Sequence, residues 1–169
     1  MDAMQEDMPL MILTADELIA VDTEGWSQFR RAARATPTAL RILRGFLDHG
    51  EPLPVEAIAD VHALQRLHDD DLIRIRDGRI DIAYPFSALP TPFMVCLPDG
   101  RERYACCATD ALGIAPMIGQ PIAIHAHCHH SGAPLGFSVS PEGPELDAAG
   151  VMLWSGQRAE EPCWSIDGL

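Results

Sequence analysis

The sequence has little positive charge and no long apolar run. Twelve lysines and arginines stand against 25 aspartates and glutamates, which gives a formal net charge of -13. Such a chain repels phosphate backbones and anionic lipid surfaces, so we expect no nucleic-acid partner. No apolar stretch approaches the roughly 18 residues that a membrane-spanning helix needs. The acidic start lacks the lysine or arginine of a signal peptide, so the sequence predicts a cytoplasmic protein with no membrane partner.

The sequence also lacks regular cysteine spacing. Its five cysteines include no pair of Cys-x-x-Cys motifs, which argues against a structural zinc site and against a disulfide framework. We therefore expect reduced thiols. The apolar fraction of 47% is that of a folded protein, and 169 residues fit one ordinary domain or two small ones.

The first half of the chain predicts a helical unit. An acidic helical arm is expected over 1–35, and a winged-helix-like domain over 36–90. The elements expected in that domain are a helix over 38–50, a short helix over 54–59, a third helix over 61–67 and a hairpin over 72–83. The third helix runs into acidic residues at 69–71, which would repel DNA, so we expect this unit to be structural.

The second half, 91–169, predicts a mostly antiparallel sheet with one short helix. Alternating apolar residues and turn-forming sequences indicate strands over 93–97, up to 104, and over 122–126, 135–139 and 150–154, with a helix over 110–118. The whole chain is therefore expected to be an α+β protein, with the functional site on the short helix of the sheet unit.

Cys107 and Asp110 stand three residues apart where a strand is expected to run into that helix. This spacing brings two side chains to one face of a helix. The helix N-terminus favours a thiolate and should lower the pKa of Cys107. A thiolate binds soft metals, and a carboxyl group beside it can move a proton. Taken singly, each residue also has an ordinary interpretation, as a buried thiol and as a carboxylate that stabilises the helix.

The remaining thiols and a histidine run are weaker candidates. Strand alternation would place His125, His127 and His129 on one face, next to Cys128 and His130, which suits zinc, copper or nickel. We prefer a polar strand end leading into a turn, because no second ligand cluster lies elsewhere. Cys106 is expected to point away from Cys107, since a disulfide between neighbours is strained. Cys96 and, taken alone, Cys163 have the pattern of packing residues.

Several short sequence motifs between residues 103 and 141 indicate one family. They are Tyr104-Ala105, Cys107-Ala108, Asp110, Leu112, Pro116, Ile118-Gly119, His127-Cys128, Ser131-Gly132-Ala133-Pro134 and Val139-Ser140-Pro141. Their register over about 40 residues is far more specific than a lone motif. In these motifs the segment resembles the alkylmercury lyases, also called organomercurial lyases.

The resemblance implies an enzyme that breaks a carbon–mercury bond by protonolysis. Cys107 and Cys163 would be the two catalytic thiolates that bind the mercury, and Asp110 the catalytic proton carrier at the metal. The substrate would be a small organometallic compound, no cofactor would be required, and mercuric ion would remain as the bound product. Small cytoplasmic thiols or a mercury-accepting protein would remove it, and a homodimer is left open. Cys128 matches a family cysteine that is expected to be structural.

The chain departs from the family in two places. Cys106 stands where an aromatic residue is common, and the sequence stops at Leu169, soon after Cys163. We therefore expect a shortened or divergent member. Two alternatives stay open: a non-catalytic soft-metal-binding or sensing protein that uses Cys106, Cys107 and the histidine run, and a relative repurposed for another lyase reaction on a metabolite.

Overall fold

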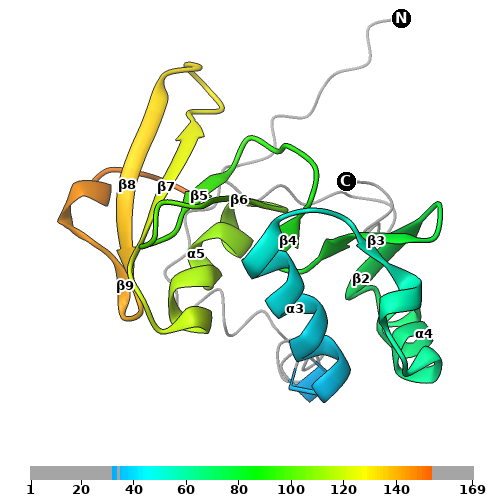
Figure 1. The fold of residues 1–169 in the computed structure, drawn as a ribbon. Helices are drawn as coiled ribbons and strands as arrows, with labels where there is room; N and C mark the ends of the chain where they lie inside the picture. The colour runs from blue at the N-terminus through cyan, green and yellow to red at the C-terminus, as the bar shows by residue number, and fades with distance from the viewer. Residues whose placement is uncertain (1–31, 34, 154–169) are drawn as a thin grey trace, which may run out of the picture.

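A computed structural model describes residues 32–33 and 35–153 of the chain. It contains helices α3 (Pro37–His49), α4 (Val61–Asp69) and α5 (Ala108–Ile118) beside an antiparallel sheet (Figure 1). The predicted α+β class is confirmed. Among these residues, no helix has both the length and the apolar character needed to cross a membrane.

Helix α3 begins and ends where its local signals place it. Thr36 is the N-cap, and its hydroxyl accepts a hydrogen bond from the Ala39 N–H at 3.3 Å. Gly50 ends the helix in the left-handed region at φ 71°, and its N–H donates to the Phe46 carbonyl. The predicted helix over 38–50 is therefore confirmed to within a residue at each end.

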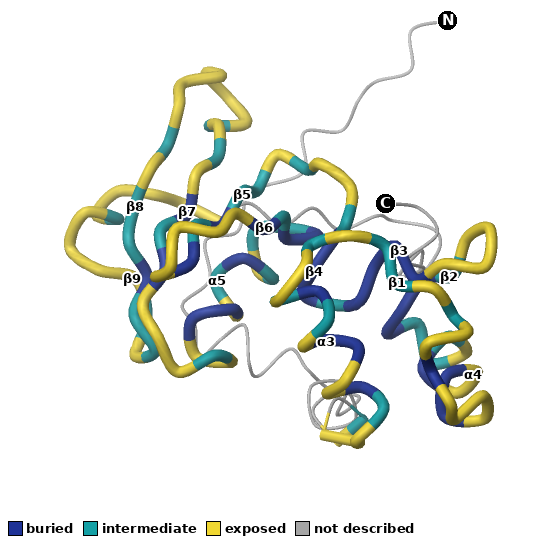
Figure 2. The backbone as a smooth tube through the Cα atoms, in the orientation of Figure 1, coloured by how far each residue is buried: buried dark blue, intermediate teal, exposed yellow. Residues whose placement is uncertain are grey.

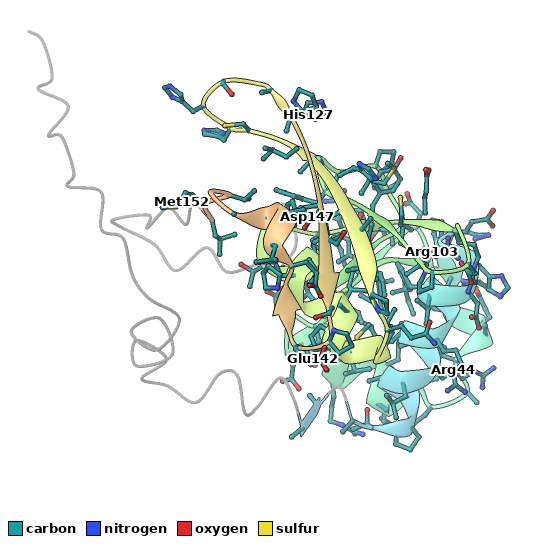
Figure 3. The ribbon with its side chains drawn as sticks, turned by 90° about the vertical axis from the view of Figure 1, so that its left-hand side faces the viewer. Arg44, Arg103, His127, Glu142, Asp147 and Met152 are labelled. Carbon is teal, nitrogen blue, oxygen red and sulfur yellow. The ribbon has the colours of Figure 1, made fainter. Side chains whose placement is uncertain are left out.

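Two arginines of the second half bind the carboxyl end of α3. Arg103 Nε donates to the carbonyls of Phe46 and Leu47, each at 2.9 Å, and Arg103 Nη2 donates to that of Asp48 at 2.8 Å. Arg101 also donates to the Leu47 and Asp48 carbonyls. Cations are favourable at this end of a helix, where carbonyls lack helical partners. Figure 3 shows Arg103 beside this helix.

The strands form one sheet that runs through both predicted units. In chain order they are β1 (Leu53–Pro54), β2 (Ile73–Arg76), β3 (Arg79–Ala83), β4 (Phe86–Ser87), β5 (Met94–Cys96), β6 (Glu102–Ala105), β7 (Ile122–His127), β8 (Pro134–Ser140) and β9 (Gly143–Pro144). The order across the sheet is β1-β3-β4-β6-β5-β7-β8-β9, and β2 also pairs with β3. The pairing of Phe86 with Ala105 joins the two halves.

The predicted hairpin over 72–83 is formed by β2 and β3. Asp77 and Gly78 connect the two strands with φ values of 49° and 72°, the backbone of a tight hairpin turn. Arg74 and Asp81 form an ion pair between these strands, with Nε and Oδ1 2.9 Å apart, and both side chains are buried. The winged-helix interpretation and the division into domains at residue 90 stay predictions.

Two elements differ from the expectation. The helix predicted over 54–59 is only a single 3-10 turn, Val55–Ala57. Residues 150–153 of the predicted strand over 150–154 are irregular, because the chain turns at Gly150 and leaves Val151, Met152 and Leu153 exposed. Residue 154 and most of the predicted arm over 1–35 lie outside the described residues.

The outer strand β8 is held by a carboxylate. After β9 the chain forms the 3-10 turn Leu146–Ala148. Asp147 accepts hydrogen bonds there from the Ser138 N–H at 3.0 Å and from the Ser138 hydroxyl at 2.8 Å. These bonds from Ser138 lower the pKa of Asp147. Figure 3 shows Asp147 alongside this edge of the sheet.

The core lies between the sheet and the helices α3 and α5 (Figure 2). Phe46 from α3, Val95 from the sheet and Ile114 from α5 are each 0% exposed. By contrast, the hairpin of β7 and β8 projects from the body and is mostly exposed towards its tip (Figures 1 and 2). The core therefore fixes the end of β6 and the start of α5, which carry the candidate site.

Candidate functional site

The candidate site is the junction where β6 passes into α5. Ala105 ends the strand, Cys106 and Cys107 follow, and the helix begins at Ala108. Cys107 is the helix N-cap, with extended backbone at φ -150° and ψ 177°. Its Sγ accepts a hydrogen bond from the Asp110 N–H at 3.4 Å. A cysteine therefore fills a position that serine, threonine or aspartate usually occupies.

The side chains of Cys107 and Asp110 also meet directly. The thiol Sγ donates to Asp110 Oδ2 at 3.0 Å, and both residues are half-buried. The spacing of three residues had placed them on one face, and the structure brings them into hydrogen-bond contact. A proton can therefore pass between a soft-metal ligand and a carboxylate without further movement of the backbone.

The expected direction of the Cys107 pKa was wrong. Burial, followed by the negative charge of Asp110 and the hydrogen bond to it, raises the pKa of Cys107 to about 11. The N–H groups of Asp110 and Thr109 act in the opposite direction, but their effect is smaller. The Cys107 thiol is therefore protonated at neutral pH, and a metal that binds the sulfur must displace its proton.

Hydrogen bonds from neighbouring loops hold the residues before Cys107. The Thr91 hydroxyl donates to the Ala105 carbonyl at 2.6 Å, and the Cys106 N–H donates to the Pro85 carbonyl at 3.0 Å. Thr91 was not among the site residues predicted from the sequence. Its only local signal is its place between Pro90 and Pro92, which marks a rigid loop but not the partner of the hydroxyl.

Cys106 and Cys107 lie in different surroundings. It is 8% exposed and packs with Ile82, against which Tyr84 also lies. Cys107 instead contacts Asp110. Cys163 lies outside the described residues, so its approach to Cys107 stays a prediction.

The histidine run lies at the projecting hairpin. Strand β7 ends at His127, and residues 128–131 form its turn. His125 and His127 are exposed, and Figure 3 shows His127 near the tip. Within 32–33 and 35–153, no group of three or more His, Cys, Asp or Glu side chains could hold a metal ion. The histidine-based metal hypothesis therefore gains no support from this part of the chain.

The four described cysteines, Cys96, Cys106, Cys107 and Cys128, are not joined in disulfides. Cys128 lies in the hairpin turn, where hydrogen bonds from Ser131 and from the His130 N–H lower its pKa. Cys96 lies in β5, where burial and the charge of Glu102 raise its pKa. Cys107 has a hydrogen bond to the carboxylate of Asp110.

Comparison with known proteins identifies a related family. Residues 86–166 match the family model described as alkylmercury lyase, a segment that includes Cys107, Asp110 and Cys163. The alkylmercury lyase of Staphylococcus epidermidis is 32% identical over 111 residues, which are 60% of this chain and 50% of that protein. That of Streptomyces lividans is 31% identical over 120 residues, 66% of this chain and 54% of that protein. The chain thus spans about half the length of these curated relatives.

A solved structure shares the fold. The crystal structure of the mercury-bound form of MerB2 aligns with a TM-score of 0.54 and 21% sequence identity. The alignment covers 71% of this chain and 65% of that chain. At this identity the likeness concerns the fold alone, so the chemistry has to be argued from the residues of this chain.

Proposed function

We propose, from the premise that this chain is a divergent relative of the alkylmercury lyases, that it cleaves carbon–mercury bonds by protonolysis. The observation that carries the proposal is the 3.0 Å hydrogen bond from Cys107 Sγ to Asp110 Oδ2. It joins a ligand for a soft metal to a group that can take up and return a proton. The substrate class is small alkyl- or arylmercury compounds.

In the first step the mercury of the substrate binds Cys107. The sulfur–mercury bond forms as the halide or small thiolate on the mercury leaves as an anion, and the thiol proton moves to Asp110, which becomes a neutral carboxylic acid. The high pKa of Cys107 means that this proton is still present when the substrate arrives. The hydrogen bond to Asp110 gives it a direct path. Substrate binding therefore transfers the Cys107 proton to Asp110, which holds it for the later protonation of the carbon.

In the second step a second thiolate, assigned to Cys163, adds to the mercury and weakens the bond to carbon. Asp110 then gives its proton to the carbon, which keeps the electron pair of the broken bond and leaves as a hydrocarbon. Asp110 returns to the carboxylate form, and two sulfurs hold the mercuric ion. Small thiols or an accepting protein would remove the ion. The sequence of steps uses no cofactor, because mercury enters as part of the substrate.

The test is release of benzene from a phenylmercury compound in the presence of excess small thiol, followed by gas chromatography. Cys107→Ser, Asp110→Asn and Cys163→Ser are measured beside Cys96→Ser, a matched control in β5. We expect release by the unchanged protein and by the control. A loss of about 100-fold or more is expected in Asp110→Asn, since a positioned proton donor contributes about that much. Release should also be lost in Cys107→Ser and Cys163→Ser, because each lacks a sulfur ligand for the mercury.

Two other results would redirect the assignment. Tight binding of mercury without benzene would favour the sequestering or sensing alternative. Release that persists in Cys163→Ser would remove Cys163 from the scheme while leaving Cys107 and Asp110 in place.

A further inference from the structure

The loop between β4 and β5 places one hydroxyl group against the strand that leads to the site. Thr91 is half-buried, and its hydroxyl donates to the Ala105 carbonyl at 2.6 Å. The same oxygen accepts a hydrogen bond from the Phe93 N–H at 3.2 Å. A second contact, to the Phe93 carbonyl, is longer at 3.4 Å, so the single hydroxyl proton belongs on the bond to Ala105. The hydroxyl therefore bridges the two backbones.

The bridge acts two residues before the reactive thiol. Ala105 is 0% exposed, and its N–H donates to the Phe93 carbonyl at 2.9 Å. Together with the bond from the Cys106 N–H to Pro85, these contacts leave the backbone little freedom before Cys107. The chain must then extend through Cys107 and turn at once into α5 for the thiol to face Asp110. A change in the direction of the Ala105 carbonyl would be passed directly to Cys107.

The residues around Thr91 keep the hydroxyl in place. Pro90 and Pro92 restrict the backbone on both sides and carry no N–H that could compete for the hydroxyl oxygen. The bridge is therefore held by a stiff segment, and little conformational entropy is lost in forming it.

We propose that Thr91 is a positioning residue, whose hydroxyl directs the backbone at Ala105 so that the Cys107 thiol meets Asp110. The inference rests on the proposed function only for its kinetic consequence. Displacements of about 1 Å at a reacting group can lower turnover on the order of 100-fold. Loss of the hydroxyl should therefore reduce kcat, while KM changes little because Thr91 is not assigned a contact with the substrate.

The test compares Thr91→Val, which keeps the shape and removes the hydroxyl, with Thr91→Ser, which keeps the hydroxyl. Thr38→Val in α3 is the matched control, and circular dichroism restricts the comparison to folded protein. We expect kcat for benzene release to fall on the order of 10- to 100-fold in Thr91→Val. It should be retained in Thr91→Ser and in the control. If Thr91→Val does not fold, Thr91→Ala takes its place.

A second readout needs no mercury and separates this inference from the proposed function. Iodoacetamide labelling at one fixed pH, followed by peptide mass spectrometry, gives the rate at Cys107 relative to Cys96 in the same molecule. We expect this ratio to change in Thr91→Val and to stay the same in Thr91→Ser. If the unchanged protein releases no benzene, the proposed lyase fails and the labelling alone decides the role of Thr91. A folded Thr91→Val with an unchanged ratio, or an equal change in Thr91→Ser, would overturn the inference.

Discussion

Asp110 controls the proton of Cys107 through its charge and its hydrogen bond, in addition to the effect of burial. Replacing Asp110 with Asn removes the negative charge. Because that charge raises the pKa of Cys107, the Asp110→Asn variant should have a lower pKa than the present value of about 11. The pH dependence of iodoacetamide labelling at Cys107 measures this, and its midpoint should move to lower pH. Burial, the largest cause, remains, so the midpoint should stay above the ordinary value for a thiol.

The control for this measurement is Asp147→Asn, which removes an exposed carboxylate on another part of the sheet. It should leave the Cys107 midpoint in place. An unchanged midpoint in Asp110→Asn as well would mean that burial alone sets the pKa of the thiol.

The ion pair of Arg74 and Asp81 carries a prediction about stability. Arg74 is 2% exposed and Asp81 6% exposed, and their side chains share two hydrogen bonds. Asp81→Ala removes the carboxylate from a buried guanidinium, which should lower the free energy of unfolding by about 3–5 kcal/mol. Urea denaturation measures the change.

The exposed pair of Arg101 and Asp99 provides the comparison. Asp99→Ala should lower the free energy of unfolding much less, because water screens exposed charges. Equal losses in Asp81→Ala and Asp99→Ala would show that burial does not determine the contribution of the inner pair.

At the level of single residues, the sequence indicates contacts between near neighbours in the chain but not contacts between distant residues. The contact of Cys107 with Asp110 follows from their spacing along one helix. The pKa of Cys107 does not, because burial depends on how the whole sheet packs around the junction. Thr91 was missed for the same reason, since its partner Ala105 lies 14 residues along the chain.

Among the elements, helix α3 depends on Arg103 from β6. Arg103→Ala removes a cation and its hydrogen bonds from three carbonyls at the helix end. We expect the free energy of unfolding to fall by about 2–3 kcal/mol, the upper range for hydrogen bonds that involve a charged group. Arg103→Lys should lose less stability because it keeps the positive charge, although it lacks the planar guanidinium that donates to several carbonyls. Chemical denaturation of both variants gives the two values.

Arg44→Ala is the matched control, because Arg44 lies exposed on the same helix (Figure 3). Its loss should change stability by no more than about 0.5 kcal/mol. If Arg103→Ala were as mild as Arg44→Ala, the contacts at the helix end would not be needed to hold α3 on the sheet.

The elements that the sequence predicted well carry their own boundary signals. Thr36 and Gly50 define α3, and Asp77-Gly78 defines the turn of the first hairpin. The pairing of β4 with β6 has no comparable signal, because it depends on residues 86 and 105 meeting in space. The expected strand over 150–154 rested on apolar character alone, and the side chains of Val151, Met152 and Leu153 are exposed.

The fold of the whole molecule buries some thiols and leaves others accessible to reagents in solution. Cys106 is buried against Ile82, whereas Cys128 lies in the turn of the projecting hairpin with a lowered pKa. Without denaturant, iodoacetamide should therefore label Cys128 much faster than Cys106. With rising urea, labelling of Cys106 should follow the loss of the circular dichroism signal. Mass spectrometry of each peptide gives both rates.

Cys96, half-buried in β5, is the internal reference for this measurement. Its rate should lie between those of Cys106 and Cys128. Rapid labelling of Cys106 in the folded protein would show that the end of β6 opens locally, without unfolding of the sheet.

The carboxylate of Asp147 has a consequence for how this protein behaves when crowded with copies of itself. An outer strand usually offers free N–H groups, which let a neighbouring chain add itself to the sheet. On β8 the Ser138 N–H is already taken by Asp147, and the short strand β9 pairs with Val139 and Ser140. A strand that approached β8 at Ser138 would meet the negative charge of Asp147, and the Ser138 N–H would already be in a hydrogen bond. The Asp147 side chain thus opposes edge-to-edge pairing of another strand at Ser138.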